Sequence, residues 1–106
     1  IDICSRKPIL ANTVGGLSGP AVFPVALRMV WQVRRAVSLP IIGMGGISTW
    51  QDAAEMLIAG AAALQIGTIL FKDPYAPVKI NKGLNEFLDS KGMKSVTELT
   101  KTIKPW

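Results

Sequence analysis

Apolar and polar residues follow two different periods along this chain. Residues 39–44 and 61–66 are short, nearly continuous apolar runs, the pattern of parallel strands that are covered on both faces. Residues 22–37, 48–59 and 75–90 instead repeat apolar side chains every three to four positions, which predicts amphipathic helices. The order helix, strand, helix, strand, helix therefore predicts parallel strands joined by a right-handed crossover.

Capping residues set the expected ends of the middle helix. Ser48 is the expected N-cap, with Gln51 at the capping-box position, and Gly60 is the expected glycine at the C-terminal end. After the last long helix, the pattern predicts a short helical turn at 95–99 and a loose end at Trp106.

Several apolar side chains are expected in the core because of their positions. The methionines Met29, Met44 and Met56 all fall on apolar positions and are expected to fill the core. One face of the first helix collects the apolar residues Ala26, Met29, Val30, Val33 and Val37. We expect this face to be buried.

The first twenty residues lack a helical period. Alternating apolar residues around Ser5-Arg6-Lys7-Pro8 predict a hairpin of two short strands within residues 1–12. Residues 13–20 form a glycine-rich loop that contains Ser18. Its glycines indicate a backbone that curls tightly or approaches a ligand, and the pattern leaves both interpretations open.

A glycine turn follows each of the two predicted strands. Gly45-Gly46 ends the first apolar run, and Gly67-Thr68 ends the second. Backbone amides near Gly46, Ile47 and Ser48 would face outward at the positive end of the next helix, where a phosphate gains hydrogen bonds. Each glycine pair alone is equally typical of a tight turn. Two such turns on adjacent strands favour a phosphate site, as after the last strands of (β/α)8 barrels.

Length and charge narrow the class further. A complete (β/α)8 barrel needs about 200 residues or more, and this chain has 106. We therefore expect an α/β fold, the incomplete C-terminal portion of a TIM barrel, with residues 1–106 as one segment of a single domain.

The net charge is +5, but the basic residues are scattered and match no nucleic-acid motif. No apolar run is long enough for a membrane span, and the single Cys4 favours the reducing cytoplasm.

Residues for catalysis are missing from the pattern. The chain has no histidine, and its carboxylates are spread singly, so the sequence predicts neither a metal site nor an acid–base pair. No base lies near Cys4, which is expected to be structural. We predict no catalytic residue in this segment.

Five stretches together resemble the C-terminal third of the class 1B, NAD-linked dihydroorotate dehydrogenases of bacteria. They are residues 5–12, 15–21, 24–30, 39–49 and 67–68. The resemblance implies an FMN-containing barrel that oxidises dihydroorotate to orotate in de novo pyrimidine biosynthesis. It also implies that Gly19 lies near the flavin and that the FMN phosphate is held by Gly45, Gly46, Gly67 and Thr68.

The resemblance implies that the catalytic and substrate-binding residues lie outside this segment. The family's catalytic cysteine, its flavin-contacting lysine and its orotate-binding asparagines would precede this segment, and Cys4 does not match that cysteine. The expected assembly is a catalytic homodimer with an electron-transfer subunit that carries FAD and a 2Fe–2S cluster and reduces NAD.

Two other functions stay open at this point. The segment could belong to another FMN barrel oxidoreductase that acts on a pyrimidine, since the residues that choose the substrate would lie upstream. It could also be a non-catalytic barrel fragment that acts as an interaction module. In isolation we expect the segment to be inactive and to associate through its open strand edges.

Overall fold

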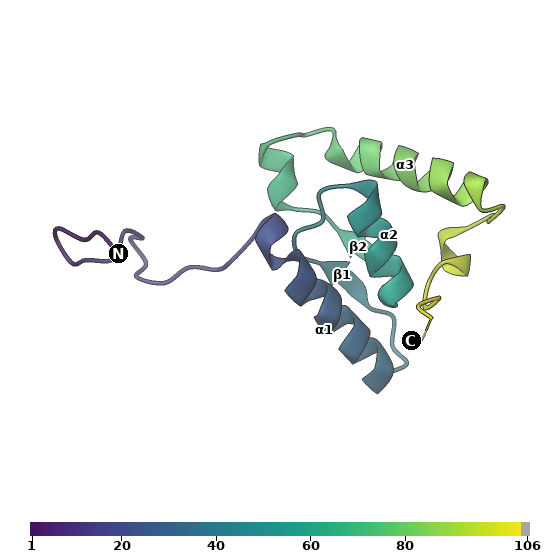
Figure 1. Ribbon diagram of the computed structural model, residues 1–106, viewed down its shortest axis with the longest axis horizontal. Coiled ribbons are helices and arrows are strands. Elements are labelled where there is room, and N and C mark those ends of the chain that lie inside the picture. The colour runs from purple at the N-terminus through teal and green to yellow at the C-terminus, as the bar shows by residue number, and fades with distance from the viewer. Residues whose placement is uncertain (105–106) are drawn as a thin grey trace.

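Two parallel strands lie at the centre of the fold, joined by a helix. The computed structural model describes residues 1–104. Strands β1 (Ile42–Met44) and β2 (Ala63–Gln65) pair in parallel, with Gly43 opposite Leu64. Helix α2 (Trp50–Ala59) connects them, so the predicted strand–helix–strand unit is confirmed (Figure 1).

The other helices agree with the sequence periods to within two residues. The remaining elements are η1 (Pro20–Val22), α1 (Phe23–Ala36), η2 (Thr68–Phe71), α3 (Ala76–Ser90) and η3 (Val96–Glu98). The expected end at Trp106 lies outside the described residues. Among the helices of residues 1–104, none combines the length and the apolar character that crossing a bilayer requires.

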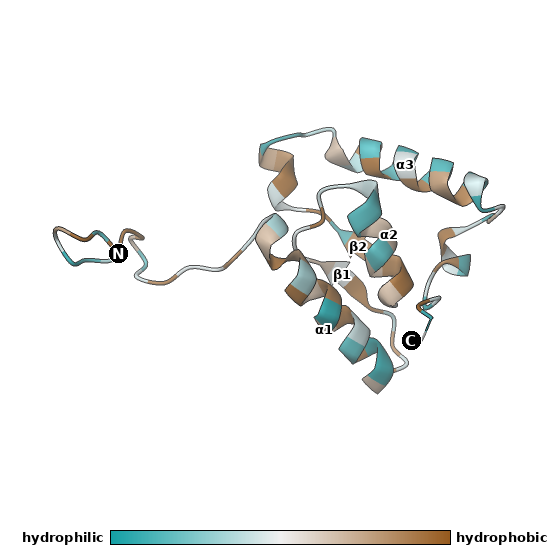
Figure 2. Cartoon of the chain, in the orientation of Figure 1, coloured by the Kyte–Doolittle hydropathy of each residue, from teal (hydrophilic) through white to brown (hydrophobic). Residues whose placement is uncertain are grey.

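Helix α2 is the centre of the core because it contacts both α1 and α3. Its side chains Ala53 and Met56 are fully buried. The face of α3 that meets α2 buries Ile80, Leu84 and Leu88. Helix α3 is therefore amphipathic, with an apolar face toward α2 and a polar face on the outside (Figure 2). Close approach of the two helices depends on Gly83, since a Cβ atom there would collide with the ring of Trp50. The Trp50 ring lies 5.5 Å from that of Phe87, between their centroids.

The other face of the sheet is open, which corrects part of the predicted core. Ile42 and Met44 are 58% and 52% exposed, and only Gly43 of β1 is buried. Met29 of α1 is also exposed, whereas Met56 is buried as predicted. The expected apolar face of α1 is therefore divided: Ala26 and Val30 are buried, while Met29, Val33 and Val37 are exposed. The reason is that nothing in residues 1–104 covers the far side of β1 or the outer side of α1.

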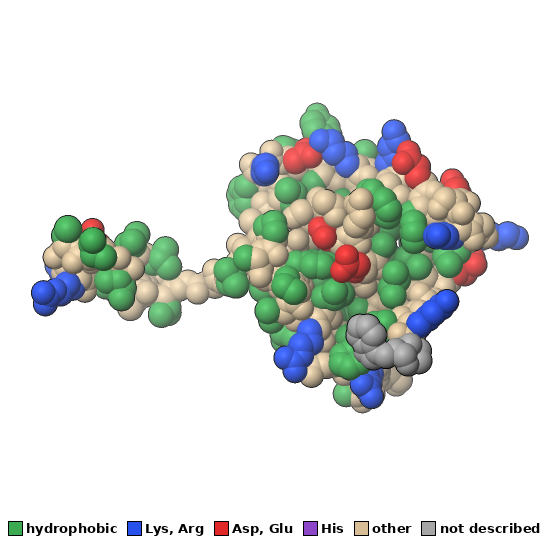
Figure 3. Space-filling model, in the orientation of Figure 1, with side chains coloured by type: hydrophobic (Ala, Val, Ile, Leu, Met, Phe, Trp, Pro, Cys, Tyr) green, Lys and Arg blue, Asp and Glu red, His purple; other side chains and the backbone are tan. Residues whose placement is uncertain are grey.

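The N-terminal residues form an extended arm rather than a hairpin of strands. Residues 1–18 are exposed and run away from the body, with apolar side chains over much of their surface (Figure 3). The predicted strands do not form: the backbone bonds across the turn, from the Asp2 amide to the Lys7 carbonyl at 2.9 Å and from the Arg6 amide to the Asp2 carbonyl at 2.8 Å, close a turn and do not continue as a ladder. The Asp2 carboxylate accepts hydrogen bonds from the Cys4 and Ser5 amides, at 3.0 and 2.6 Å. The turn itself is correctly placed, and Arg6 adopts φ +59° within it.

Candidate anion-binding site

The carboxyl ends of β1 and β2 open onto a cavity of about 240 Å³. Three segments line it, residues 17–19, 44–48 and 65–69 without Ile66, together with Val22. The five residues predicted for the site all lie on this lining: Gly19, Gly45, Gly46, Gly67 and Thr68. Residues up to fifty positions apart thus meet because parallel strands place their carboxyl ends at one edge.

Several backbone N–H groups on this lining have no acceptor within residues 1–104, including those of Gly19, Gly45 and Ile69. Four of them lie in the predicted phosphate turns and belong to Gly46, Ile47, Gly67 and Thr68. We call these four groups the open amides. Gly67 and Thr68 are exposed, so water can also accept from their amides. Two turns that each present two open amides to one cavity are suited to an anion.

The cap of α2 differs from the prediction, and the difference restricts the site. Thr49, rather than Ser48, is the N-cap, and its side chain accepts from the Asp52 amide at 3.2 Å. The Asp52 carboxylate in turn accepts from the amides of Ser48 and Thr49, both at 2.9 Å. The capping box is thus Thr49 with Asp52, because Asp52 reaches both amides and Gln51 is exposed. The Ser48 amide, expected to face a phosphate, is already used.

No charged side chain of residues 1–104 lines the cavity, so backbone dipoles determine the electrostatic potential inside it. Among the described lining residues there is no acid, lysine or arginine. The side chains that can form hydrogen bonds are Ser18, Ser48, Gln65 and Thr68, and the Ser48 hydroxyl donates to the Gly46 carbonyl at 3.2 Å. An anion here would be held chiefly by N–H dipoles, as in other backbone anion sites.

Gln65 is the polar lining residue that sequence reasoning missed, beside the apolar Leu17, Val22 and Ile69. It is the last residue of β2 and pairs in register with Met44, which also lines the cavity. A signal was present, since Gln65 is the single polar residue of the run 61–66. A polar side chain at the carboxyl end of a parallel strand lies where α/β folds bind their ligands.

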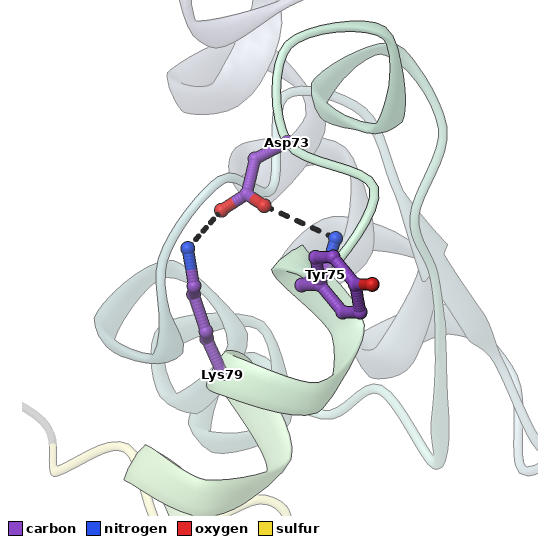
Figure 4. A network of polar contacts seen from close by, with 3 residues as sticks. All are labelled: Asp73, Tyr75 and Lys79. Atoms are coloured by element: carbon purple, nitrogen blue, oxygen red, sulfur yellow. Dashed lines mark hydrogen bonds and ion pairs between the residues drawn. The ribbon is translucent and has the colours of Figure 1, made fainter.

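A separate polar network lies beyond the second turn, at the start of α3 (Figure 4). The Asp73 carboxylate accepts from the Lys79 ammonium at 2.6 Å and from the Tyr75 amide at 3.0 Å. The Lys79 hydrogen bond, aided by the Tyr75 amide, lowers the pKa of Asp73 below its ordinary value. These residues do not line the cavity, so the network secures the start of α3 and takes no part in the site.

Catalytic and metal-binding groups are not assembled at the cavity. Cys4 lies exposed on the arm, away from the lining. Within residues 1–104, no three histidine, cysteine or acidic side chains gather in a way that could hold a metal ion. What the arrangement offers is binding: neutral walls, four open amides and a few hydroxyl and amide side chains.

The fold and the site together fit an α/β-barrel unit with a candidate anion site beyond adjacent strand ends. The family model of dihydroorotate dehydrogenase matches residues 1–88, so the chain belongs to the dihydroorotate dehydrogenase family. The sequence resemblance to this family is confirmed.

Known relatives agree with this assignment. The chain is 60% identical, over 93% of its length, to a Parabacteroides distasonis protein named dihydroorotate dehydrogenase B (NAD(+)), catalytic subunit. It is 51% identical, over 98% of its length, to a Solibacter usitatus protein provisionally named dihydroorotate dehydrogenase A (fumarate). The chain spans about a third of the length of these relatives.

A solved structure supports the barrel assignment. DHODH of Eimeria tenella, crystallised with ferulenol, superposes with a TM-score of 0.78 at 26% sequence identity. The match covers 87% of this chain and 26% of that one. The predicted fold class, a portion of a TIM barrel, is therefore confirmed.

Proposed function

We propose that this chain is the FMN-phosphate-binding portion of a dihydroorotate dehydrogenase. Residues 1–106 would form the C-terminal part of a single FMN-binding barrel, and the whole protein would oxidise dihydroorotate to orotate in pyrimidine biosynthesis. Two observations support this proposal: membership of the family, and the four open amides that share one cavity.

The residues present fit the phosphate end of FMN. The open amides of Gly46 and Ile47 approach from the first turn, and those of Gly67 and Thr68 from the second. Hydrogen bonds to an ionised group contribute about 1.5–3 kcal/mol each. No carboxylate of residues 1–104 lines the cavity to compete for the amides, and Asp52, which accepts from the Ser48 amide, is held by its capping bonds.

The segment's part in the reaction is to bind and to orient. FMN, when bound, supplies the hydride-accepting chemistry. Gly19, whose Cβ position would lie 3.9 Å from the Thr68 side chain, would lie beside the flavin. The base that removes the substrate proton would come from outside this segment, because the cavity lining contains no titratable side chain.

Partners and compartment follow from the same proposal. We propose a homodimer that works with a subunit carrying FAD and a 2Fe–2S cluster, because the Parabacteroides distasonis relative is named as a catalytic subunit that uses NAD. The cytoplasm is the proposed location. Fumarate is the second candidate for the electron acceptor, on the name of the Solibacter usitatus relative.

Flavin binding by the whole protein tests the proposal. By the whole protein we mean this segment together with the rest of the proposed barrel. It should bind FMN at least about 100-fold more tightly than riboflavin, which lacks the phosphate, since two charged hydrogen bonds amount to that ratio. Equal affinities would contradict the phosphate site.

Turnover assays test the substrate and the acceptor. The whole protein should oxidise dihydroorotate and leave dihydrouracil unchanged, which separates this function from that of another pyrimidine-oxidising FMN barrel. With the electron-transfer subunit present, NAD should be reduced. Turnover with fumarate and none with NAD would assign the acceptor to the second candidate.

A further inference from the structure

The segment beyond the second turn carries several exposed apolar side chains. Phe71 ends η2 and is 96% exposed, and Tyr75 and Val78, at the start of α3, are 71% and 66% exposed. Leu70, beside Phe71, is 39% exposed. Single exposed apolar residues are common, but several large ones bordered by polar residues are typical of an interaction surface. We call these four residues the η2–α3 patch.

Hydrogen bonds tie this patch to the wall of the cavity. The Asp73 amide donates to the Ile69 carbonyl at 2.8 Å, and the Asp73 carbonyl accepts from the Ala76 amide at 3.0 Å. The Asp73 carboxylate also accepts from the Tyr75 amide and the Lys79 ammonium (Figure 4). Because Ile69 lines the cavity, these bonds hold the patch beside it.

The patch lies apart from the side of α3 where the rest of a barrel would join. Ile80 faces the core, and Pro77 and Asn81 line a second cavity of about 510 Å³ beside β2. Within residues 1–104, β2 pairs with β1 alone, so a further barrel strand would pair along its other edge, at this cavity. A helix turns about 100° per residue, so Tyr75 and Val78 lie on roughly the opposite side from Ile80. In a barrel the outer side of the helix ring faces solvent, and this part of the patch would stay exposed.

Basic residues exceed acidic ones around the patch. The charged residues there are Lys72, Lys79 and Lys82 against Asp73 and Glu86. Lys79 pairs with Asp73 and Lys82 with Glu86, whereas Lys72 forms no ion pair with any residue of 1–104. Interfaces place apolar and aromatic side chains at the centre and charges at the rim. A partner that fits would therefore present an apolar centre and an acidic residue opposite Lys72.

We propose that the η2–α3 patch is the docking surface for an electron-accepting protein subunit. The inference rests on the proposed function, in which a flavin bound at the cavity takes electrons from the substrate. A protein acceptor can take these electrons only where its own redox group comes close to the flavin. The patch is an apolar surface that begins one residue beyond Ile69 of the cavity wall. The Parabacteroides distasonis relative is named a catalytic subunit, a name that implies a further subunit.

Binding of the electron-transfer subunit to the whole protein, measured by titration calorimetry, tests the docking surface. Phe71→Ala should weaken this binding by about tenfold or more, as loss of an aromatic side chain at the centre of an interface does. Because Phe71 is 96% exposed and does not line the cavity, FMN affinity and melting temperature should stay unchanged. Oxidation of dihydroorotate with a small dye as acceptor should also stay unchanged, while NAD reduction at low subunit concentration should fall by a similar factor to the binding.

Two further variants separate the patch from the rest of the surface. Ile103→Ala is the matched control, because Ile103 is 51% exposed and lies close to the C-terminal end, on the opposite side of the fold from residues 68–71 (Figure 1). It should leave subunit binding unchanged. Lys72→Glu should weaken subunit binding, and this loss should shrink with added salt, because a charge at the rim acts through a screened interaction.

The proposal would be overturned if Phe71→Ala bound the subunit like the wild type, or if the wild type bound no such subunit. It would also be overturned if Phe71→Ala lowered the melting temperature of the whole protein, which would mean that its own chain covers the patch, or separated a homodimer, which would mean that a second copy does. Failure of the proposed function looks different, since the wild type would then bind FMN no more tightly than riboflavin, whatever its affinity for the subunit.

Discussion

The two strand–turn units of this chain share a sequence pattern and differ in how firmly the turn is held. The turn after β1 is held by two sets of contacts. Gly46 packs against Gly19 and Phe23, and the capping box of Thr49 and Asp52 stabilises the start of α2. The turn after β2 leads into the short η2, whose start has no side-chain cap. No described atom lies within 4 Å of the position that a Cβ atom at Gly67 would take.

The difference shows that a glycine at a strand end has two distinct physical causes. In the first turn the cause lies inside the protein, in a positive φ and a backbone contact. In the second turn Gly67 has φ −129°, and no described atom lies within 4 Å of its Cβ position, which is compatible with ligand access. The first turn is therefore expected to be rigid without ligand, and the second to gain order when ligand binds.

The largest expected effect comes from a branched side chain at the rigid turn. Gly46→Val should destabilise the whole protein by about 3 kcal/mol or more, since a β-branched residue at positive φ adds strain to the clash. Urea denaturation measures this change. Gly67→Val is the matched variant, and its stability without ligand should remain within about 1 kcal/mol of the wild type. Similar losses in the two variants would remove the distinction between the turns.

Loss of the capping box should have the next largest effect. Asp52→Ala removes the acceptor of the Ser48 and Thr49 amides, and loss of such a cap costs about 0.5–2 kcal/mol. Thermal melting measures it. Asp52→Asn keeps one acceptor oxygen and should recover most of the stability. A melting temperature of Asp52→Ala equal to the wild type would mean that the cap does not hold the first turn.

The same Asp52 substitution should also tighten FMN binding. Asp52→Asn removes a negative charge from the residue that bonds Ser48 on the cavity lining, and it should leave riboflavin affinity unchanged. The gain should shrink with added salt, because ions screen the interaction between Asp52 and the phosphate, with a screening length of about 10 Å at 0.1 M ionic strength. Titration of both flavins at two salt concentrations checks this. A gain for riboflavin equal to that for FMN would contradict an electrostatic cause.

The smallest expected effect concerns pH and the network beyond the second turn. The Lys79 ammonium, with the Tyr75 amide, lowers the pKa of Asp73 in the folded state. Because the folded pKa is below the unfolded one, this stabilisation is present above the ordinary aspartate pKa and is lost as pH falls through the lowered value. The Lys79 side chain is 69% exposed and the Asp73 side chain 30%, so solvent screens the pair and the effect is small.

Melting curves of Asp73→Asn and the wild type between neutral and acidic pH measure this effect. The difference between them should be constant near neutrality and should disappear in acid. A difference that grows as the pH falls would contradict the assigned direction of the pKa.

The element order and the site positions could be predicted from the sequence because they depend on local pattern. The helical periods, Gly60 as the end of α2, where its φ is +123°, and the two turns all follow from neighbouring residues. The position of the cavity followed too, since parallel strands align their ends. Each of the five predicted site residues lies on its lining.

Other features depend on contacts that local pattern cannot reveal. Ser48 and Thr49 are both good N-caps, and only the reach of the Asp52 carboxylate selects Thr49. Burial of Met29 was predicted from its face on α1, yet no described element packs there. The different surroundings of Gly46 and Gly67 arise from Gly19 and Phe23, which are more than twenty residues away in sequence.

The most direct test follows individual amides while flavin binds. In the ¹⁵N-labelled whole protein, FMN should shift the N–H signals of the four open amides strongly, as new hydrogen bonds to phosphate form. Riboflavin should not produce these shifts, and the Ser48 and Thr49 signals should change little because Asp52 already holds those amides. Shifts centred on Ser48 and Thr49, or shifts of the open amides that riboflavin reproduces, would contradict phosphate binding between the two turns.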